Sequence, residues 1–374
     1  MKYLFTFNAF YLILILMLVE YNPYDYYEAG SHLFTSYSIL IFFFLVASRI
    51  DRNITLTKVS KTEDFRVNLL LVFCAVYFLG LTALRINLGL STQEFRNLFF
   101  YNSTFGFFSS QYFIYATILL NSLIWIGLLT SITSQSTSQI GKYVISYVLL
   151  DSASGGRMAV FYLAFLLITT VLLTGKIRYK YPSRAFIKTT ALLTLIIFGF
   201  MYVTIMRIGE DGKSFLEFLY QYLIGPSFLY QAEIADSYVE SLISRSYMAW
   251  FASLDWAIIG FLKILGSDLN TLFVEWNPAL ATGRYLNSEY GINAHYTGFL
   301  YFALSFGIFS EILIGVLFAV SILVFSKRCP ELAIYLGFIL TMMPRENLLN
   351  SPQFIIILLY FLFIKRNKRM PCPT

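Results

Sequence analysis

The feature that most constrains this chain is a series of long apolar runs that carry almost no charge. Runs of roughly 17 to 20 apolar residues, coiled as helices, match the thickness of a bilayer core. They do not alternate with polar residues, as the strands of a membrane β-barrel would. Charged residues make up 13% of the 374 positions, which is about half the share of a soluble domain. The sequence therefore predicts an all-α polytopic membrane protein.

We expect about ten transmembrane helices. The expected spans are 3–19, 33–48, 67–84, 113–131, 143–150, 158–174, 189–206, 296–325, 332–343 and 354–364. The eighth span is unusually long, so it is interpreted as a half-helix, a kink near Gly307 and a full crossing. The Ser- and Thr-rich stretch 131–142 is interpreted as a linker.

The spans divide the chain into three parts. Residues 1–206 hold the first seven spans and a Gly-Gly-Arg turn, 207–295 form a large outer loop, and 296–374 hold the last spans and a basic tail. With both termini in the cytoplasm, about two-thirds of the 27 Lys and Arg residues face inward, which agrees with the positive-inside rule. In the outer loop, two apolar stretches are interpreted as interfacial helices. One or two extra crossings there, giving eleven or twelve spans, stay open.

The basic residues expected on the outer face are mostly arginine. They are Arg85, Arg96, Arg157, Arg207, Arg245, Arg284 and Arg345, with Lys213 and Lys263. Arginine is favoured where a planar fork must hold phosphate or carboxylate through two hydrogen bonds. The outer face is therefore expected to bind an anion. At Arg85 and Arg207, which end spans, an anchoring role at the membrane surface is the main alternative.

Two polar segments gather candidate site residues. The first, 276–307, contains Arg284 as an anion ligand and His295 as a general base; Glu289 in the same segment and Asp255 before it are alternative bases. In the same segment, the expected substrate-binding residues are Tyr290, Asn293 and Tyr296. His295 could instead cap the helix that follows it, and Glu289 could be a solvated loop acid.

The second segment, 151–160, contains two glycines that break the helix and allow a ligand to approach, followed by Arg157. A tight helical hairpin with a surface-seeking arginine is its alternative interpretation. Arg345 lies between two short spans and is expected either to contact substrate or to anchor the chain at the interface. No Asp-x-Asp pair and no His/Cys cluster is present, so no metal site is expected.

The layout resembles a known family. The chain has many spans, a Gly-Gly-Arg turn after a short span, a large outer loop, and then HYTGFLYFALSFGIFSEILIG before short terminal spans. It is similar in this to the O-antigen polymerases of the Wzy type and to wider oligosaccharide repeat-unit polymerases. The resemblance implies a GT-C type glycosyltransferase of the bacterial inner membrane that needs neither metal nor cofactor. It would join undecaprenyl-pyrophosphate-linked oligosaccharide units on the outer face into a polysaccharide such as O-antigen.

The resemblance also implies roles for particular residues and partners. Arg157 and Arg284 would hold the pyrophosphate, and His295 could correspond to a histidine of the related ligases. Membrane lipids and a chain-length regulator protein are the implied partners, and nucleic acid is not. An O-antigen ligase-like transferase, a transporter of lipid-linked oligosaccharide and a membrane acyltransferase remain alternatives.

Overall fold

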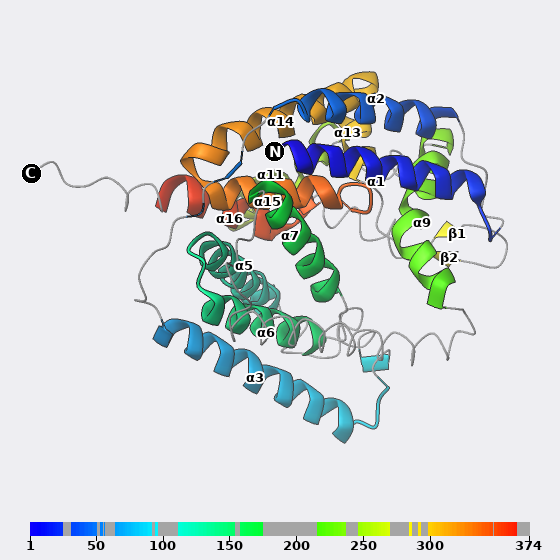
Figure 1. Cartoon of the computed structure of the whole chain (residues 1–374). Helices are drawn as coiled ribbons and strands as arrows, with labels where there is room; N and C mark the ends of the chain where they lie inside the picture. Colours follow the sequence, from blue (N-terminus) through cyan, green and yellow to red (C-terminus); the bar gives the residue numbers. More distant parts are fainter. Residues whose placement is uncertain are drawn as a thin grey trace, which may run out of the picture. The chain divides into compact units, whose positions relative to one another are not determined.

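The computed structural model describes residues 1–24, 31–50, 53–54, 56, 64–91, 94–95, 111–153, 158–174, 215–236, 246–269, 284–285, 291–292, 298–346 and 348–364. These residues are helical almost throughout (Figure 1), as expected. Four of the described helices are long and apolar enough to cross a membrane by length and composition: Lys2–Tyr21, Arg66–Asn87, Ala116–Thr133 and Ser310–Arg328. The chain is thus consistent with an α-helical membrane protein, and the expected count of about ten spans stays a prediction.

The helices have the following bounds. They are α1 Lys2–Tyr21, α2 Ser31–Ala47, α3 Asp64–Asn87, α5 Gln111–Thr133, α6 Thr137–Ala153, α7 Met158–Thr174, α9 Phe215–Asp236, α11 Ala252–Ile264, α13 Gly298–Phe306, α14 Ser310–Arg328, α15 Pro330–Met342 and α16 Pro352–Leu359. Shorter helical turns are η1 Ser246–Phe251, η2 Gly307–Phe309, η3 Leu348–Asn350 and the π-helical η4 Tyr360–Ile364.

The kink expected near Gly307 is confirmed. Helix α13 ends at Phe306, a single 3-10 turn follows, and α14 starts at Ser310. Gly307 has a φ of 55°, a left-handed conformation that glycine adopts without the steric cost of a Cβ. The long apolar run is therefore two helices with a break between them.

The linker expected at 131–142 is wrong. Helix α5 continues to Thr133, and α6 begins at Thr137 after a turn in which Gln135 has a φ of 58°. Ser and Thr are weak helix formers, but packing of an apolar face overrides propensity. Here the ring of Tyr143 occupies the space where a Cβ on Gly127 would lie, so α5 and α6 approach closely as a helical hairpin.

A small β-hairpin lies in the region predicted to be the large outer loop. Strand β1 (Arg284–Tyr285) pairs antiparallel with β2 (Gly291–Ile292), so that Arg284 is opposite Ile292. The apolar stretches of the same region are helical, in α9 and in η1 with α11. Helix α9 contains Pro226, which removes one backbone donor from the helix interior.

The chain divides into two compact units. Unit 1 comprises Met1–Ile54, Thr169–Gly175 and Thr204–Ile355, and unit 2 comprises Thr55–Ile168, Lys176–Val203 and Ile356–Thr374. The centre of unit 1 is α15, in which every residue from Glu331 to Met342 is buried. Around it, a Cβ on Gly337 would come within 3.0 to 3.1 Å of Leu173, Thr169 and Leu4. This close packing leaves no space for a side chain at that position.

Buried hydroxyl and amide groups tie the centre of unit 1 together. The side chain of Asn8 donates to the Thr341 hydroxyl at 3.4 Å, and Thr169 donates to the same oxygen at 3.4 Å. The Thr341 hydroxyl in turn donates to the carbonyl of Gly337 at 2.9 Å. Three separate stretches of chain therefore meet at one polar point inside an apolar core, where each polar group must be hydrogen bonded.

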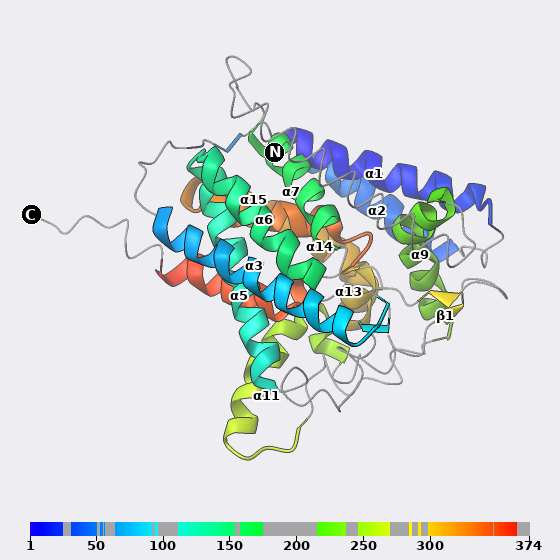
Figure 2. The same cartoon turned by 90° about the horizontal axis from the view of Figure 1, so that it is seen from below.

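Unit 2 is organised around α6, which packs against both α3 and α5 (Figure 1, Figure 2). One cluster of buried apolar residues in unit 2 is formed by Leu81, Phe95 and Ala153. Helix α3 is the least covered of the four candidate spans, because 17% of its apolar stretch is buried, compared with 39 to 44% in the other three. Its exposed residues, Leu69, Val72, Phe73, Val76, Leu79 and Ile86, follow helical spacing. That stripe suits contact with lipid acyl chains.

Candidate functional site

Most of the expected site residues lie outside the described part of the chain. These are Arg157, Arg207, Glu289, Tyr290, Asn293, His295 and Tyr296. For Arg284 the backbone is described, in β1. Arg85 and Arg345 are described with their side chains, and the two have different surroundings. The expected meeting of several outer arginines at one pocket therefore stays a prediction.

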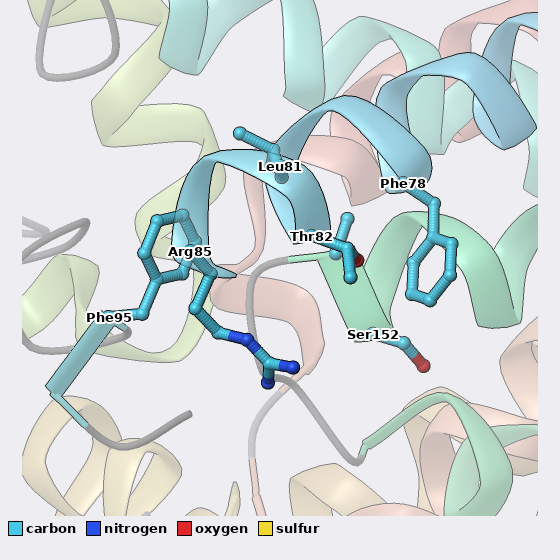
Figure 3. Close-up of a pocket in the computed structure, with 7 residues that line it drawn as sticks. Phe78, Leu81, Thr82, Arg85, Phe95 and Ser152 are labelled. Atoms are coloured by element: carbon cyan, nitrogen blue, oxygen red, sulfur yellow. The ribbon is translucent and has the colours of Figure 1, made fainter. Parts of the chain in front are cut away.

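Arg85 lines a pocket in unit 2. The cavity has a volume of about 100 Å³ and is bounded by Phe78, Leu81, Thr82, Arg85, Phe95, Ser152 and Ala153. Figure 3 shows the Arg85 side chain extending from the end of α3, with Ser152 on the neighbouring helix α6. Since a single water needs about 10 to 15 Å³ of such space, the cavity can hold a group the size of a phosphate or carboxylate.

The sequence around Arg85 explains why the helix ends beside the pocket. Gly89 has a φ of 64°, and the N–H of Leu90 donates to the Arg85 carbonyl at 3.2 Å. A left-handed glycine that reverses the chain in this way is a common helix C-terminal signal. A cation in the last turn also interacts favourably with the negative end of the helix dipole. Arg85 is therefore held where α3 meets the pocket.

A capping box places the next pocket residue. The Ser91 N–H donates to the Glu94 carboxylate at 2.8 Å, and the Glu94 N–H donates to the Ser91 hydroxyl at 3.2 Å. This reciprocal pair is the signature of a helix start, and it fixes Phe95, which is buried against the pocket. The side-chain hydrogen bond with Ser91, followed by its backbone hydrogen bond, lowers the pKa of Glu94 below its usual value of 4.5.

The opposite wall of the pocket is the end of α6. Ser152 is exposed and Ala153 is buried there, and Ser154 separates Ala153 from the Gly-Gly-Arg segment. The side chain of Asp151 accepts a hydrogen bond from the Ala159 N–H, in the first turn of α7, at 3.0 Å. The junction between α6 and α7 is thus joined across the intervening residues by a carboxylate.

The pocket combines one positive charge, two hydroxyl groups and an apolar wall. Among the described residues that line the cavity, Arg85 supplies the charge, Thr82 and Ser152 supply the hydroxyls, and none is acidic. Guanidinium and hydroxyl groups donate hydrogen bonds to phosphate and carboxylate oxygens. The apolar wall suits a hydrocarbon stem on the same ligand. The arrangement can therefore hold the anionic head of an amphiphile.

Arg345 is in a different environment, inside unit 1. It is 2% exposed and lies in the turn after α15, where its N–H donates to the Met342 carbonyl at 2.8 Å. Its guanidinium interacts electrostatically with Tyr11 of α1, and the neighbouring Glu346 is 5% exposed. This burial does not fit an anchor at the membrane surface. Arg345 instead belongs to the polar interior of unit 1.

Sequence reasoning missed a buried hydroxyl network in unit 1. The Tyr37 and Ser227 hydroxyls lie 2.9 Å apart, those of Ser36 and Tyr230 lie 3.1 Å apart, and Tyr230 interacts electrostatically with Glu311. Glu311 is buried in the first turn of α14. An acid inside the apolar run 296–325 was a signal that could have identified this position, because buried carboxylates in membrane helices are costly unless paired.

Two expectations about acids and metals can be compared with the described residues. Asp255, an alternative general base, is 3% exposed in the first turn of α11. In the described part of the chain, no group of three or more His, Cys, Asp and Glu residues is placed to hold a metal ion.

Comparisons with protein-family models, with curated proteins and with solved structures find no match to this chain.

Proposed function

We propose that this protein is a membrane glycosyltransferase that polymerises undecaprenyl-pyrophosphate-linked oligosaccharide units on the outer face of the bacterial inner membrane. The observation that carries the proposal is the Arg85 pocket at the end of α3, a helix long and apolar enough to cross a bilayer. Such a pocket suits a substrate that has a hydrocarbon tail and an anionic head. The resemblance of the sequence layout to repeat-unit polymerases supplies the reaction.

The protein needs to stabilise only one bond-exchange step, because the donor sugar already carries a diphosphate leaving group. The acceptor hydroxyl oxygen forms a bond to the anomeric carbon of the donor, and the bond from that carbon to the diphosphate oxygen breaks. The diphosphate leaves with the electron pair, and the hydroxyl proton passes to a base. Fixed guanidinium groups stabilise the charge that grows on the leaving group. Proximity of acceptor and donor supplies much of the remaining rate.

The proposed roles follow from these needs. Arg85 holds one anionic oxygen of the lipid-linked substrate in its pocket, and Arg157 and Arg284 hold the remainder of the diphosphate. His295 takes the acceptor proton, with Glu289 as its alternative. Tyr290, Asn293 and Tyr296 bind the sugars, and Arg207 is a further ligand of the anion, whereas Arg345, which is buried inside unit 1, has no substrate contact in this proposal. In this proposal both termini are cytoplasmic.

The test is chain extension by the purified full-length protein reconstituted in lipid with a lipid-linked repeat unit. The wild type is expected to give a ladder of products. Arg85→Ala should abolish most of the extension, whereas Arg66→Ala is the matched control, since Arg66 is an exposed arginine near the other end of α3. Arg157→Ala and Arg284→Ala should also abolish it. Full activity of Arg85→Ala, Arg157→Ala and Arg284→Ala would sink the proposal.

A further inference from the structure

Asp151 occupies a position that its own helix disfavours. It lies in the last turn of α6, which ends at Ala153. The C-terminal end of a helix carries partial negative charge, so a carboxylate there is unfavourable, and cations are preferred. A residue that conflicts with its local structure is expected to have a role elsewhere.

That role is visible in the contact across the helix junction. The Asp151 carboxylate accepts a hydrogen bond from the N–H of Ala159 at 3.0 Å. Ala159 lies in the first turn of α7, where the N–H groups have no partner within the helix and the dipole is positive. Asp151 therefore acts as an N-terminal cap for α7, supplied from the preceding helix.

The cap lies next to the pocket wall. The two residues that follow Asp151 are Ser152 and Ala153, and both line the cavity that contains Arg85. Ala153 also packs with Leu81 and Phe95 in one cluster of buried apolar residues. The segment that connects α6 to α7 along the chain contains two glycines, which cost more entropy to order than other residues. Fixing this junction fixes the wall opposite Arg85.

We propose that Asp151 is a positioning residue for the Arg85 pocket, which keeps Ser152 and Ala153 in place so that an anionic ligand is held between α3 and α6. The inference rests on the proposed function in taking this pocket to be used by the enzyme. It differs from a purely stabilising cap because it holds the wall against which Arg85 binds the ligand. The effect of Asp151 on ligand binding should then disappear when Arg85 is absent.

Binding to the full-length protein in lipid nanodiscs tests the proposal. The probes are farnesyl phosphate, farnesol and inorganic phosphate, and the variants are Asp151→Ala, Asp151→Asn, Arg85→Ala and the double variant Arg85→Ala with Asp151→Ala. Asp268→Ala is the matched control, because it removes one exposed acid from unit 1. Binding of either phosphate that depends on both Arg85 and Asp151 supports the proposal, and the probe that binds distinguishes a lipid phosphate from free phosphate.

The expected result is a weakening of farnesyl phosphate binding by about five- to tenfold in Asp151→Ala, which corresponds to the stability usually lost with a helix cap if that loss falls on the ligand-bound state. Asp151→Asn should bind within about twofold of the wild type, since its amide oxygen still accepts the hydrogen bond. In the Arg85→Ala background, the loss of Asp151 should add less than about twofold, since residues that act together are not additive.

Three outcomes would overturn the inference. They are unchanged or tighter binding by Asp151→Ala, an equal effect of Asp151→Ala with and without Arg85, and no rescue by asparagine in a protein that remains folded. Because binding is measured without glycosyl transfer, the two proposals fail separately. If the variants bind as expected but no chain extension occurs, the proposed function fails and the positioning role stands. If chains extend normally in Asp151→Ala and its binding is unchanged, the positioning role fails alone.

Discussion

Arg85 and Arg345 are both arginines at the C-terminal end of an apolar helix, yet the protein surrounds them differently. Arg85 is half-buried in unit 2 and lines a cavity that can admit a ligand. Arg345 is buried in unit 1, where it interacts with Tyr11 and lies beside the buried Glu346. A charge buried inside protein is costly unless its neighbours are arranged around it. The comparison suggests that Arg345 contributes to the fold and Arg85 to binding.

The largest expected effect is a loss of stability when the buried Arg345 is removed. Arg345→Ala should lower the free energy of unfolding by about 3 to 5 kcal/mol, the usual cost of removing one partner from a buried charged group. The protein should then be recovered poorly from detergent and unfold at a much lower temperature, as followed by fluorescence-detected size exclusion. Arg85→Ala, which removes a charge next to a cavity, is the control and should unfold close to the wild type. Equal stability of the two variants would contradict the assignment of Arg345 to the fold and of Arg85 to binding.

The next effect concerns binding. Arg85→Ala should weaken farnesyl phosphate binding by about 10- to 100-fold, because a hydrogen bond to a charged group is worth about 1.5 to 3 kcal/mol. Arg85→Lys keeps the charge without the planar fork and should recover part of the affinity. Titration in nanodiscs measures both, with Arg66→Ala as the control. Arg85→Ala binding as tightly as the wild type would assign the pocket to packing alone.

The packing around two helix glycines differs as well, namely Gly337 in unit 1 and Gly80 in unit 2. A Cβ on Gly337 would meet three neighbours at 3.0 to 3.1 Å, whereas nothing lies within 4 Å of one on Gly80 of α3. Gly337→Leu should therefore destabilise the protein by about 1 to 3 kcal/mol or more through overpacking. Gly80→Leu should be neutral or slightly stabilising, because leucine is the better helix former. Thermal unfolding of both variants tests this difference in stability. A similar loss of stability in Gly337→Leu and Gly80→Leu would contradict it.

The smallest effect is expected from the capping box beside the pocket. The pKa of Glu94 is lowered in the folded protein, so its contribution to stability is present above the unfolded value and lost as the pH falls through the folded value. Glu94→Gln should be slightly less stable than the wild type at neutral pH, and the difference should vanish in acid. Unfolding temperatures measured from pH 7 down to pH 3 test this. A difference that persists at the lowest pH would mean that Glu94 acts by something other than its charge.

Several elements of the fold could be predicted from the sequence because apolar periodicity determines them. The span expected at 158–174 coincides with α7, and the break near Gly307 follows from a glycine in an otherwise continuous apolar run. The helical part of 131–142 could not be predicted, because its serines and threonines are poor helix formers and the packing of Tyr143 on Gly127 is not visible in a linear pattern. Local propensity and tertiary packing point in opposite directions there.

The sequence predicted the kind of ligand that the candidate site would bind, but not which residues would form the site. A bias toward arginine on one face indicated an anion, and Arg85 does line a pocket. That Thr82 and Ser152 would join it depends on how α3 and α6 pack, which the order of residues along the chain does not contain. The role of Asp151 as a cap for α7 was equally hidden, because it depends on a contact between residues that are eight positions apart.

The thin cover on α3 has a consequence for how this molecule can change over time. Outward positions such as Leu69, Val72 and Val76 are largely exposed in the described part of the chain, so they need only remain apolar, and leucine, isoleucine, valine or phenylalanine would serve alike. The inward side of the same helix, with Leu81 and Arg85, must fit a partner. Two homologous proteins could therefore share few identical residues along α3 and still keep the same small cavity at its end.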